Sequence, residues 1–226
     1  MSLIVKICGL STPEALDVAL ETGADMVGFV FFPPSPRNIT LATARALGAR
    51  VRGRANKVAL TVDAGDELLG KIVDALKPDI LQLHGSESPE RVKAVRQTYG
   101  LPAMKALPIA VGGDLDRATR YASVADRLLF DARAPREATR PGGLGNTFDW
   151  HLLQHLDLDV PFMLSGGLDA GNVGDALRIT GAAGVDVSSG VEHAPGEKDL
   201  EKIRAFIHAA RDAAARMSVQ QVASPA

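Results

Sequence analysis

The chain has little of several features that define whole classes of protein. It contains one cysteine in 226 residues, so an intramolecular disulfide, and with it a disulfide-built secreted scaffold, is excluded. Its net charge of −2 gives neither the basic surface of a nucleic-acid-binding protein nor a polybasic membrane patch. Aromatic residues make up 4% of the chain, too few for a platform on which bases stack.

Long apolar runs are also missing. The N-terminal residues MSLIVKICGL hold too short an apolar stretch for the core of a signal peptide. The sequence contains no run of about 18 apolar residues, so no transmembrane helix is expected. We therefore expect a soluble, cytoplasmic protein with no membrane partner and no nucleic-acid partner. Hydrophobic residues still make up 46% of the chain, which is enough for the core of one large domain.

The chain alternates short apolar runs with longer segments of helical period. Several runs are almost wholly apolar, as in strands of a parallel sheet that is covered on both faces. We expect strands at residues 3–7, 26–31, 57–62, 79–83, 102–107, 127–131, 161–165 and 183–187. We expect helices within residues 11–23, 40–49, 66–76, 88–100, 114–122, 149–155, 170–180 and 196–217.

Eight strand–helix units in a chain of this length predict an α/β fold, a single-domain (β/α)₈ TIM barrel. A doubly wound parallel sheet is the structural alternative. We expect residues 1–212 to form the barrel domain. The sequence after Met217 carries no pattern, so residues 213–226 are expected to form a loose C-terminal extension.

Active sites of such barrels lie at the C-terminal ends of the strands, and several polar side chains fall there. Cys8 follows the first strand, and Asp131 closes the sixth. A lone buried cysteine usually acts as a small hydrophobe, but this position favours chemistry. Arg37 stands in the stiff, proline-rich loop after strand two, where it could equally be a solvated cation. His84 follows strand four, either as a rim residue or as a base.

Two glycine- and serine-containing turns predict a phosphate site. SGGL follows the seventh strand and SSGV follows the eighth, the two loops with which barrels often bind phosphate. Bare backbone N–H groups and hydroxyls are suitable donors for a phosphate. The long segment ARAPREATRPGGLGNTFDW is typical of a functional lid or of a disordered loop. The five histidines show no metal-ligand spacing at strand ends, so no metal is expected.

Six motifs occur in the order of one known family. They are KICGL, GFVFFPPSPRNI, LQLHG, GGLGNTFDW, LSGGL and GVDVSSGVE. Together they resemble the phosphoribosylanthranilate isomerases of tryptophan biosynthesis, over residues 3–208. Where Leu144 stands in GGLG, that family usually has a small hydroxyl residue. At this position we therefore expect ligand contact from the backbone rather than from the side chain.

The resemblance implies a cofactor-free isomerase acting on a small phosphorylated substrate. The reaction would convert N-(5′-phosphoribosyl)anthranilate to 1-(2-carboxyphenylamino)-1-deoxyribulose 5-phosphate by an Amadori rearrangement. By motif, Cys8 would be the base, Asp131 the acid and Arg37 the clamp for the anthranilate carboxylate. The substrate would also be lined by His84 and Asp186. The phosphate loops would be formed by Gly166, Gly167, Ser188, Ser189 and Gly190.

This chemistry sets conditions on two side chains. An acid must protonate the ribose ring oxygen, and a base must then take the C2 proton. Acid and base must stand on opposite sides of the sugar, so residues from strands one and six are suitable. Asp131 must carry a proton to donate it. Cys8 must be a thiolate, so its pKa is expected below the usual value of about 8.5.

Other functions remain open at this point. A phosphate-binding lyase or synthase would need a catalytic lysine, for which Lys57 and Lys105 are candidates. The chain could also be a non-catalytic barrel that binds a phosphorylated ligand without converting it. A further alternative is a metal-dependent epimerase, which would need histidine ligands for its metal. The sequence does not determine the oligomeric state, and a monomer is favoured. It also does not say whether a second sugar phosphate is isomerised.

Overall fold

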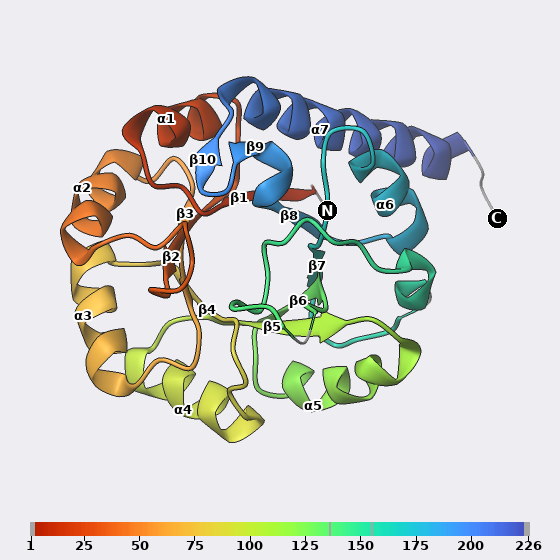
Figure 1. Cartoon of the computed structure of the whole chain (residues 1–226). Coiled ribbons are helices and arrows are strands. Elements are labelled where there is room, and N and C mark those ends of the chain that lie inside the picture. The colour runs from red at the N-terminus through yellow and green to blue at the C-terminus, as the bar shows by residue number, and fades with distance from the viewer. Residues whose placement is uncertain (1–2, 136, 155, 224–226) are drawn as a thin grey trace.

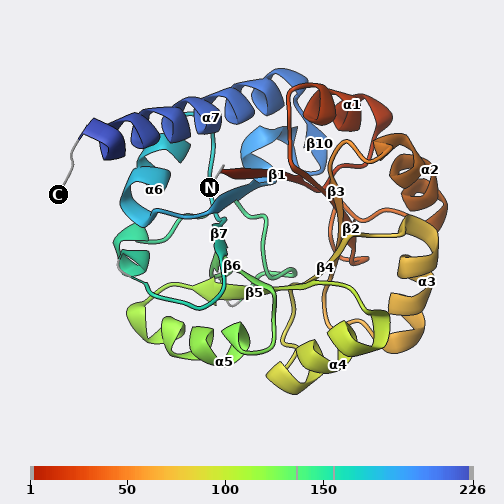
Figure 2. The same cartoon turned by 180° about the vertical axis from the view of Figure 1, so that it is seen from behind.

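The expected strands form, and they close on themselves. In the computed structural model, which describes residues 3–135, 137–154 and 156–223, eight parallel strands form a closed barrel (Figures 1 and 2). Because β1 pairs with β8, the TIM barrel is confirmed and the open doubly wound sheet is wrong. The strands are β1 (Ile4–Cys8), β2 (Met26–Phe31), β3 (Asn56–Thr61), β4 (Ile80–Leu83), β5 (Ala103–Ile109), β6 (Arg127–Ala132), β7 (Phe162–Leu164) and β8 (Gly184–Val187).

Helices form a ring around the barrel (Figure 1). Within the described ranges they are α1 (Pro13–Glu21), α2 (Leu41–Val51), α3 (Asp66–Leu76), α4 (Pro89–Tyr99), α5 (Ala118–Ala122), preceded by the 3₁₀ segment η1 (Gly112–Arg117), α6 (Val173–Thr180) and α7 (Leu200–Ala223). Their starts follow the sequence signals. The Thr12 hydroxyl accepts from the Ala15 N–H before α1, and Ser88 does the same for Arg91 before α4.

The helix expected at 149–155 is wrong. Only a 3₁₀ turn, η2 (Trp150–Leu153), forms there. Asp149 caps it by accepting from the His151 N–H, and Leu153 is buried. Gln154 then takes an extended conformation, which ends the turn. Residue 155 lies outside the described residues.

The C-terminal segment that the sequence leaves without a pattern is helical as far as the structure describes it. Helix α7 crosses residue 212 without a break and continues to Ala223. Ala213 and Met217 pack against the hydrophobic core; they are one helical turn apart and so share a face. No glycine or proline interrupts residues 200–223, so nothing local stops the helix. Residues 224–226 lie outside the described range.

The inside of the barrel determines which side chains reach the site. Alternate residues of a strand point to the same face, so Ile4, Lys6 and Cys8 of β1 all point inward. Ile4 packs against an apolar cluster that contains Met26 and Met163. Cys8 belongs to a second inner cluster at the other end of β1. Lys6 therefore lies between two apolar layers, inside the barrel.

The segment after β8 contains a small sheet that the apolar pattern does not predict. The 3₁₀ turn η3 (Ser189–Val191) leads into an antiparallel hairpin of β9 (Glu192–Ala194) and β10 (Glu197–Lys198). The hairpin lies beside the C-terminal end of β1, close to α7 (Figure 1). Glu192 and Lys198 of the hairpin point toward the mouth of the barrel, where Glu192 contacts Arg37 and Lys198 contacts Ser188.

Candidate active site

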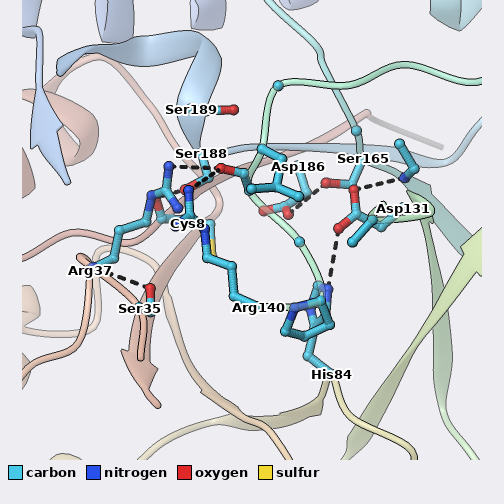
Figure 3. A pocket seen from close by; sticks show the side chains of 18 of the residues that line it. Cys8, Ser35, Arg37, His84, Asp131, Arg140, Ser165, Asp186, Ser188 and Ser189 are labelled. Carbon is cyan, nitrogen blue, oxygen red and sulfur yellow. Dashed lines mark hydrogen bonds and ion pairs between the residues drawn. The ribbon is translucent and has the colours of Figure 1, made fainter. Parts of the chain in front are cut away.

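A pocket of about 780 Å³, counting its open mouth, lies at the C-terminal ends of the strands. All predicted site residues except Gly190 line it: Cys8, Arg37, His84, Asp131, Gly166, Gly167, Asp186, Ser188 and Ser189. Figure 3 shows Cys8, Arg37 and Ser188 on one side and Asp131 with His84 on the other. Gly190 acts through packing instead, because a Cβ there would overlap the Leu168 carbonyl.

Cys8 is the last residue of β1, and 3% of it is exposed. Burial raises the pKa of the thiol above its usual value, and the charge of Lys6 only partly opposes this. The expectation of a lowered pKa is therefore wrong for the unliganded protein. The reason is that the thiol lies in an apolar inner cluster with Val30 and Leu60.

Asp131 and His84 form a hydrogen-bonded pair across the pocket from Cys8. Asp131 accepts from its neighbour's backbone N–H at 2.9 Å, and its other oxygen lies 3.2 Å from His84 Nε2. His84 Nδ1 lies 2.9 Å from the Gln82 side-chain nitrogen. Because an amide nitrogen only donates, Nδ1 is the acceptor and Nε2 carries the hydrogen that points to Asp131. Gln82 thus determines the tautomer of His84.

Arg37 is held by an acidic partner. Its Nε and Nη2 donate to the two carboxylate oxygens of Glu192, each at 2.7 Å. Nη2 also donates to the Gly143 carbonyl in the long loop after β6. The guanidinium fork is therefore already used, and only Nη1 remains for a ligand. The expected clamp would hold a carboxylate through two nitrogens of Arg37, but here one nitrogen is left for that contact.

Glu192 and Lys198 are site residues that the sequence argument missed. Lys198 donates to Glu192 at 2.7 Å and to the Ser188 carbonyl at 2.9 Å. Burial alone would raise the pKa of Glu192, but Arg37 and Lys198 hold it below its usual value. Glu192 lies in the GVDVSSGVE motif, so the motif could have marked it as a site residue. Nothing in the sequence, however, pairs it with Arg37 or Lys198.

Arg140, on the loop after β6, is a second cation that was missed. It lines the same pocket. Among the described residues no carboxylate lies within ion-pair distance of it, and its buried Nε has no hydrogen-bond partner. Burial and the nearby charge of Arg37 lower its pKa.

The loops after β7 and β8 have the backbone that the glycines predicted. Gly166 and Gly167 have φ angles of 91° and 62°, which side chains rarely tolerate. Within the described residues their N–H groups make no backbone hydrogen bond, so they remain available as donors. The Ser188 hydroxyl instead donates to the Cys8 carbonyl at 3.2 Å, which connects this loop to the end of β1.

Asp186 lines the pocket, but it already has a partner. One carboxylate oxygen forms an ion pair with Lys6 Nζ at 2.7 Å. The other accepts from the Ser165 hydroxyl at 3.1 Å. All three residues are buried. Lys6 was not predicted as a site residue, although strand alternation from Cys8 places it on the inner face.

The two lysines that a lyase could use for catalysis, Lys57 and Lys105, already bind other groups of the protein. Lys105 forms an ion pair with Glu87 at 2.8 Å and donates to the carbonyls of Leu83 and Gly85. Lys57 donates to the Leu76 carbonyl, at the end of α3.

In the part of the chain that the structure describes, no group of three or more metal-ligating side chains is arranged to hold an ion. No helix there is long and apolar enough to cross a membrane.

Known proteins with a similar sequence and fold point to one family. The family model described as N-(5′-phosphoribosyl)anthranilate (PRA) isomerase matches residues 5–209. The chain is 65% identical over 224 residues to the N-(5′-phosphoribosyl)anthranilate isomerase of Nitrobacter winogradskyi, covering 99% of each chain. A crystal structure of the phosphoribosyl anthranilate isomerase from Thermotoga maritima superposes with a TM-score of 0.85 at 34% identity, covering 93% of this chain and 99% of that one. A second isomerase structure, a complex with reduced 1-(o-carboxyphenylamino)-1-deoxyribulose 5-phosphate, gives 0.80 at 31% identity with the same coverage.

Proposed function

Because this chain belongs to the N-(5′-phosphoribosyl)anthranilate isomerase family, we propose that Cys8 and Asp131 are the base and the acid of the family's reaction. That reaction, an Amadori rearrangement in tryptophan biosynthesis, isomerises N-(5′-phosphoribosyl)anthranilate to 1-(2-carboxyphenylamino)-1-deoxyribulose 5-phosphate. The observation that carries the assignment is the strand order.

The strand order supports a phosphate site between the proposed acid and the proposed base. β7 and β8 lie between β6, which carries Asp131, and β1, which carries Cys8. A phosphate held by the loops after β7 and β8 would therefore bring the attached ribose between Asp131 and Cys8. The free N–H groups of Gly166 and Gly167 would hold the dianion, with the Ser189 hydroxyl beside them.

The proton transfers then follow in order. Asp131 gives its proton to the ring oxygen, the bond from C1 to that oxygen breaks, and the anilino nitrogen lone pair forms the C1=N double bond. Cys8, as thiolate, takes the proton from C2. The electrons of that C–H bond form C1=C2, and the π electrons of C1=N return to the nitrogen as its lone pair. The enolamine loses its hydroxyl proton at C2 and gains one at C1, which gives the ketone. Substrate and product are isomers, so no cofactor is consumed.

His84 would hold Asp131 for this step. The Nε2–H of His84 points at Asp131 because Gln82 occupies the other ring nitrogen. The hydrogen bond would hold the carboxyl group in one orientation toward the ribose. His84 thus acts on the acid rather than on the substrate directly.

The anthranilate group would lie on the apolar side of the pocket. Val30, Phe32 and Leu60 form that wall beside Cys8, which suits an aromatic ring. Nη1 of Arg37 and the guanidinium of Arg140 are the cations available for the carboxylate. Glu192 would keep Arg37 in place and leave Nη1 as the donor.

Replacing Arg37 with lysine should raise KM for the natural substrate. An ammonium group cannot donate to Glu192 from two nitrogens and still present a third to the ligand. The measurement is KM for the natural substrate and for a substrate analogue that lacks the anthranilate carboxylate. We expect a smaller penalty for the analogue. The matched Arg140→Lys variant shows which guanidinium meets the carboxylate, and equal penalties on both substrates in Arg37→Lys would mean that Arg37 has another role.

The phosphate site should work without a divalent cation. Activity is expected to be unchanged in EDTA, and inorganic phosphate is expected to compete with substrate. Gly167→Val is a poor probe here, because φ is 62° and a Cβ would crowd Asn146 and Thr147. Ser189→Ala is the better variant, and it should weaken the competition by phosphate. Loss of activity in EDTA with recovery in Mg²⁺ would overturn this assignment.

We also propose that the enzyme acts as a monomer in the cytoplasm. One chain carries the proposed acid, base, carboxylate contact and phosphate loops around one pocket, so a single copy can supply each of these roles. A reducing compartment would keep the lone thiol free. Light scattering of the native protein tests the monomer, and a dimer mass would contradict it.

A further inference from the structure

Lys6 is a fully buried cation directly beneath the proposed base. It has no exposed surface, and burying a charge is costly unless a partner compensates for it. Its partner is Asp186, at 2.7 Å on the neighbouring strand β8. A buried ion pair does not usually stabilise a fold more than apolar residues would, so packing alone does not account for a lysine here.

The position of Lys6 relative to Cys8 suggests a role. Both side chains point inward from β1, and both lie over Gly28 of β2. An ideal Cβ at Gly28 would lie 2.9 Å from Cys8 Sγ and 3.2 Å from Lys6 Nζ. The missing side chain of Gly28 leaves the room in which the ammonium and the sulfur lie together.

We propose that Lys6 is a positioning residue that stabilises the thiolate of Cys8 with a fixed positive charge from inside the barrel. The proposal rests on the assignment of Cys8 as the base. Asp186 would keep the ammonium in place, and the Ser165 hydroxyl would hold Asp186 through its other oxygen. Lys6 itself would not touch the substrate, because it is sealed beneath Cys8.

The charges around Lys6 support a fixed cation rather than a proton carrier. Burial alone would lower the pKa of Lys6, but Asp186 and Cys8 together raise it above its usual value, so Lys6 keeps its proton. For the Cys8 thiol, burial raises the pKa most, and Lys6 is the strongest of the charges that lower it. The charged groups that face Cys8 from the surrounding elements are Asp186, Lys198, Arg37 with its partner Glu192, and Asp131 across the pocket.

The test is a direct titration of the thiol in Lys6→Met. The chain has one cysteine, so thiolate absorbance in the ultraviolet, with Cys8→Ser as the blank, reports Cys8 alone. An opposite charge at this range shifts a pKa by about 1–3 pH units. We expect the titration of Cys8 to move up in pH by that amount. The acidic limb of kcat/KM should move with it, because the thiolate is the active form.

Lys105→Met is the matched control. Lys105 is also a buried barrel lysine. Its replacement by methionine also leaves a buried carboxylate, that of Glu87, without its partner. Both variants should lose thermal stability, but only Lys6→Met should move the Cys8 titration. If Lys6→Met loses stability and leaves that titration in place, Lys6 is structural and the proposal is wrong.

A second variant covers the case in which Lys6→Met does not fold. Lys6→Met with Asp186→Asn replaces the ion pair by neutral groups and leaves no charge unpaired. Because Lys6 influences Cys8 more than Asp186 does, the titration should still move up, by less. An unchanged titration in this variant also overturns the proposal. If the titration moves but Cys8→Ala keeps full activity, the proposed base, and not the role of Lys6 on the thiol, has failed.

Discussion

Asp131→Asn is expected to lower kcat by about 10²–10⁴, the usual contribution of a placed general acid. Asparagine has nearly the same shape and can still accept the hydrogen bond from His84, but it has no acidic proton for the ring oxygen. Product should therefore bind with nearly unchanged affinity. The measurements are kcat with substrate and the dissociation constant of the product by calorimetry.

Asp63→Asn is the control for this prediction. Asp63 also follows a barrel strand, β3, but it accepts from the Ser86 N–H and does not line the pocket that contains Cys8. It has a φ of 49°, which asparagine tolerates. We expect this variant to keep its kcat. Turnover near the parental rate in Asp131→Asn would remove Asp131 from the role of acid.

Cys8→Ala should lower kcat by a similar factor of about 10²–10⁴. Alanine fits the small inner cluster but removes the group that takes the C2 proton. Cys8→Ser should be no better, because a hydroxyl stays protonated at neutral pH. If a lysine were the catalytic group, Lys105→Met would lose activity instead; we expect its loss to be far smaller than that of Cys8→Ala.

A substrate deuterated at C2 separates the two roles. In Cys8→Ala, removal of the C2 proton becomes the slow step, so the deuterated substrate should react more slowly. In Asp131→Asn, ring opening is slow, and the same label should have little effect. The opposite pattern of isotope effects would mean that the acid and the base have been exchanged.

The sequence alone determined much of the framework. Strand positions followed from the apolar runs, because strands covered by helices on both faces need apolar residues at nearly every position. The barrel followed from the number of strand–helix units, and the site followed from the rule that strand ends carry it. Cys8 and Asp131 could be named because each stands directly at such an end.

The tertiary structure decided the partners. Arg37 and Glu192 are 155 residues apart, and only closure of the barrel brings the β2 loop to the β9 hairpin. Helix α7 continues past Met217, where the expected helix ends, to Ala223, and Ala213 and Met217 pack this end of the helix against the core. Strand alternation places Lys6 on the same face as Cys8, but its pairing with Asp186 needed β1 to close against β8. Charges far apart in the chain find their partners only through the fold, because their interaction depends on distance in space and on burial.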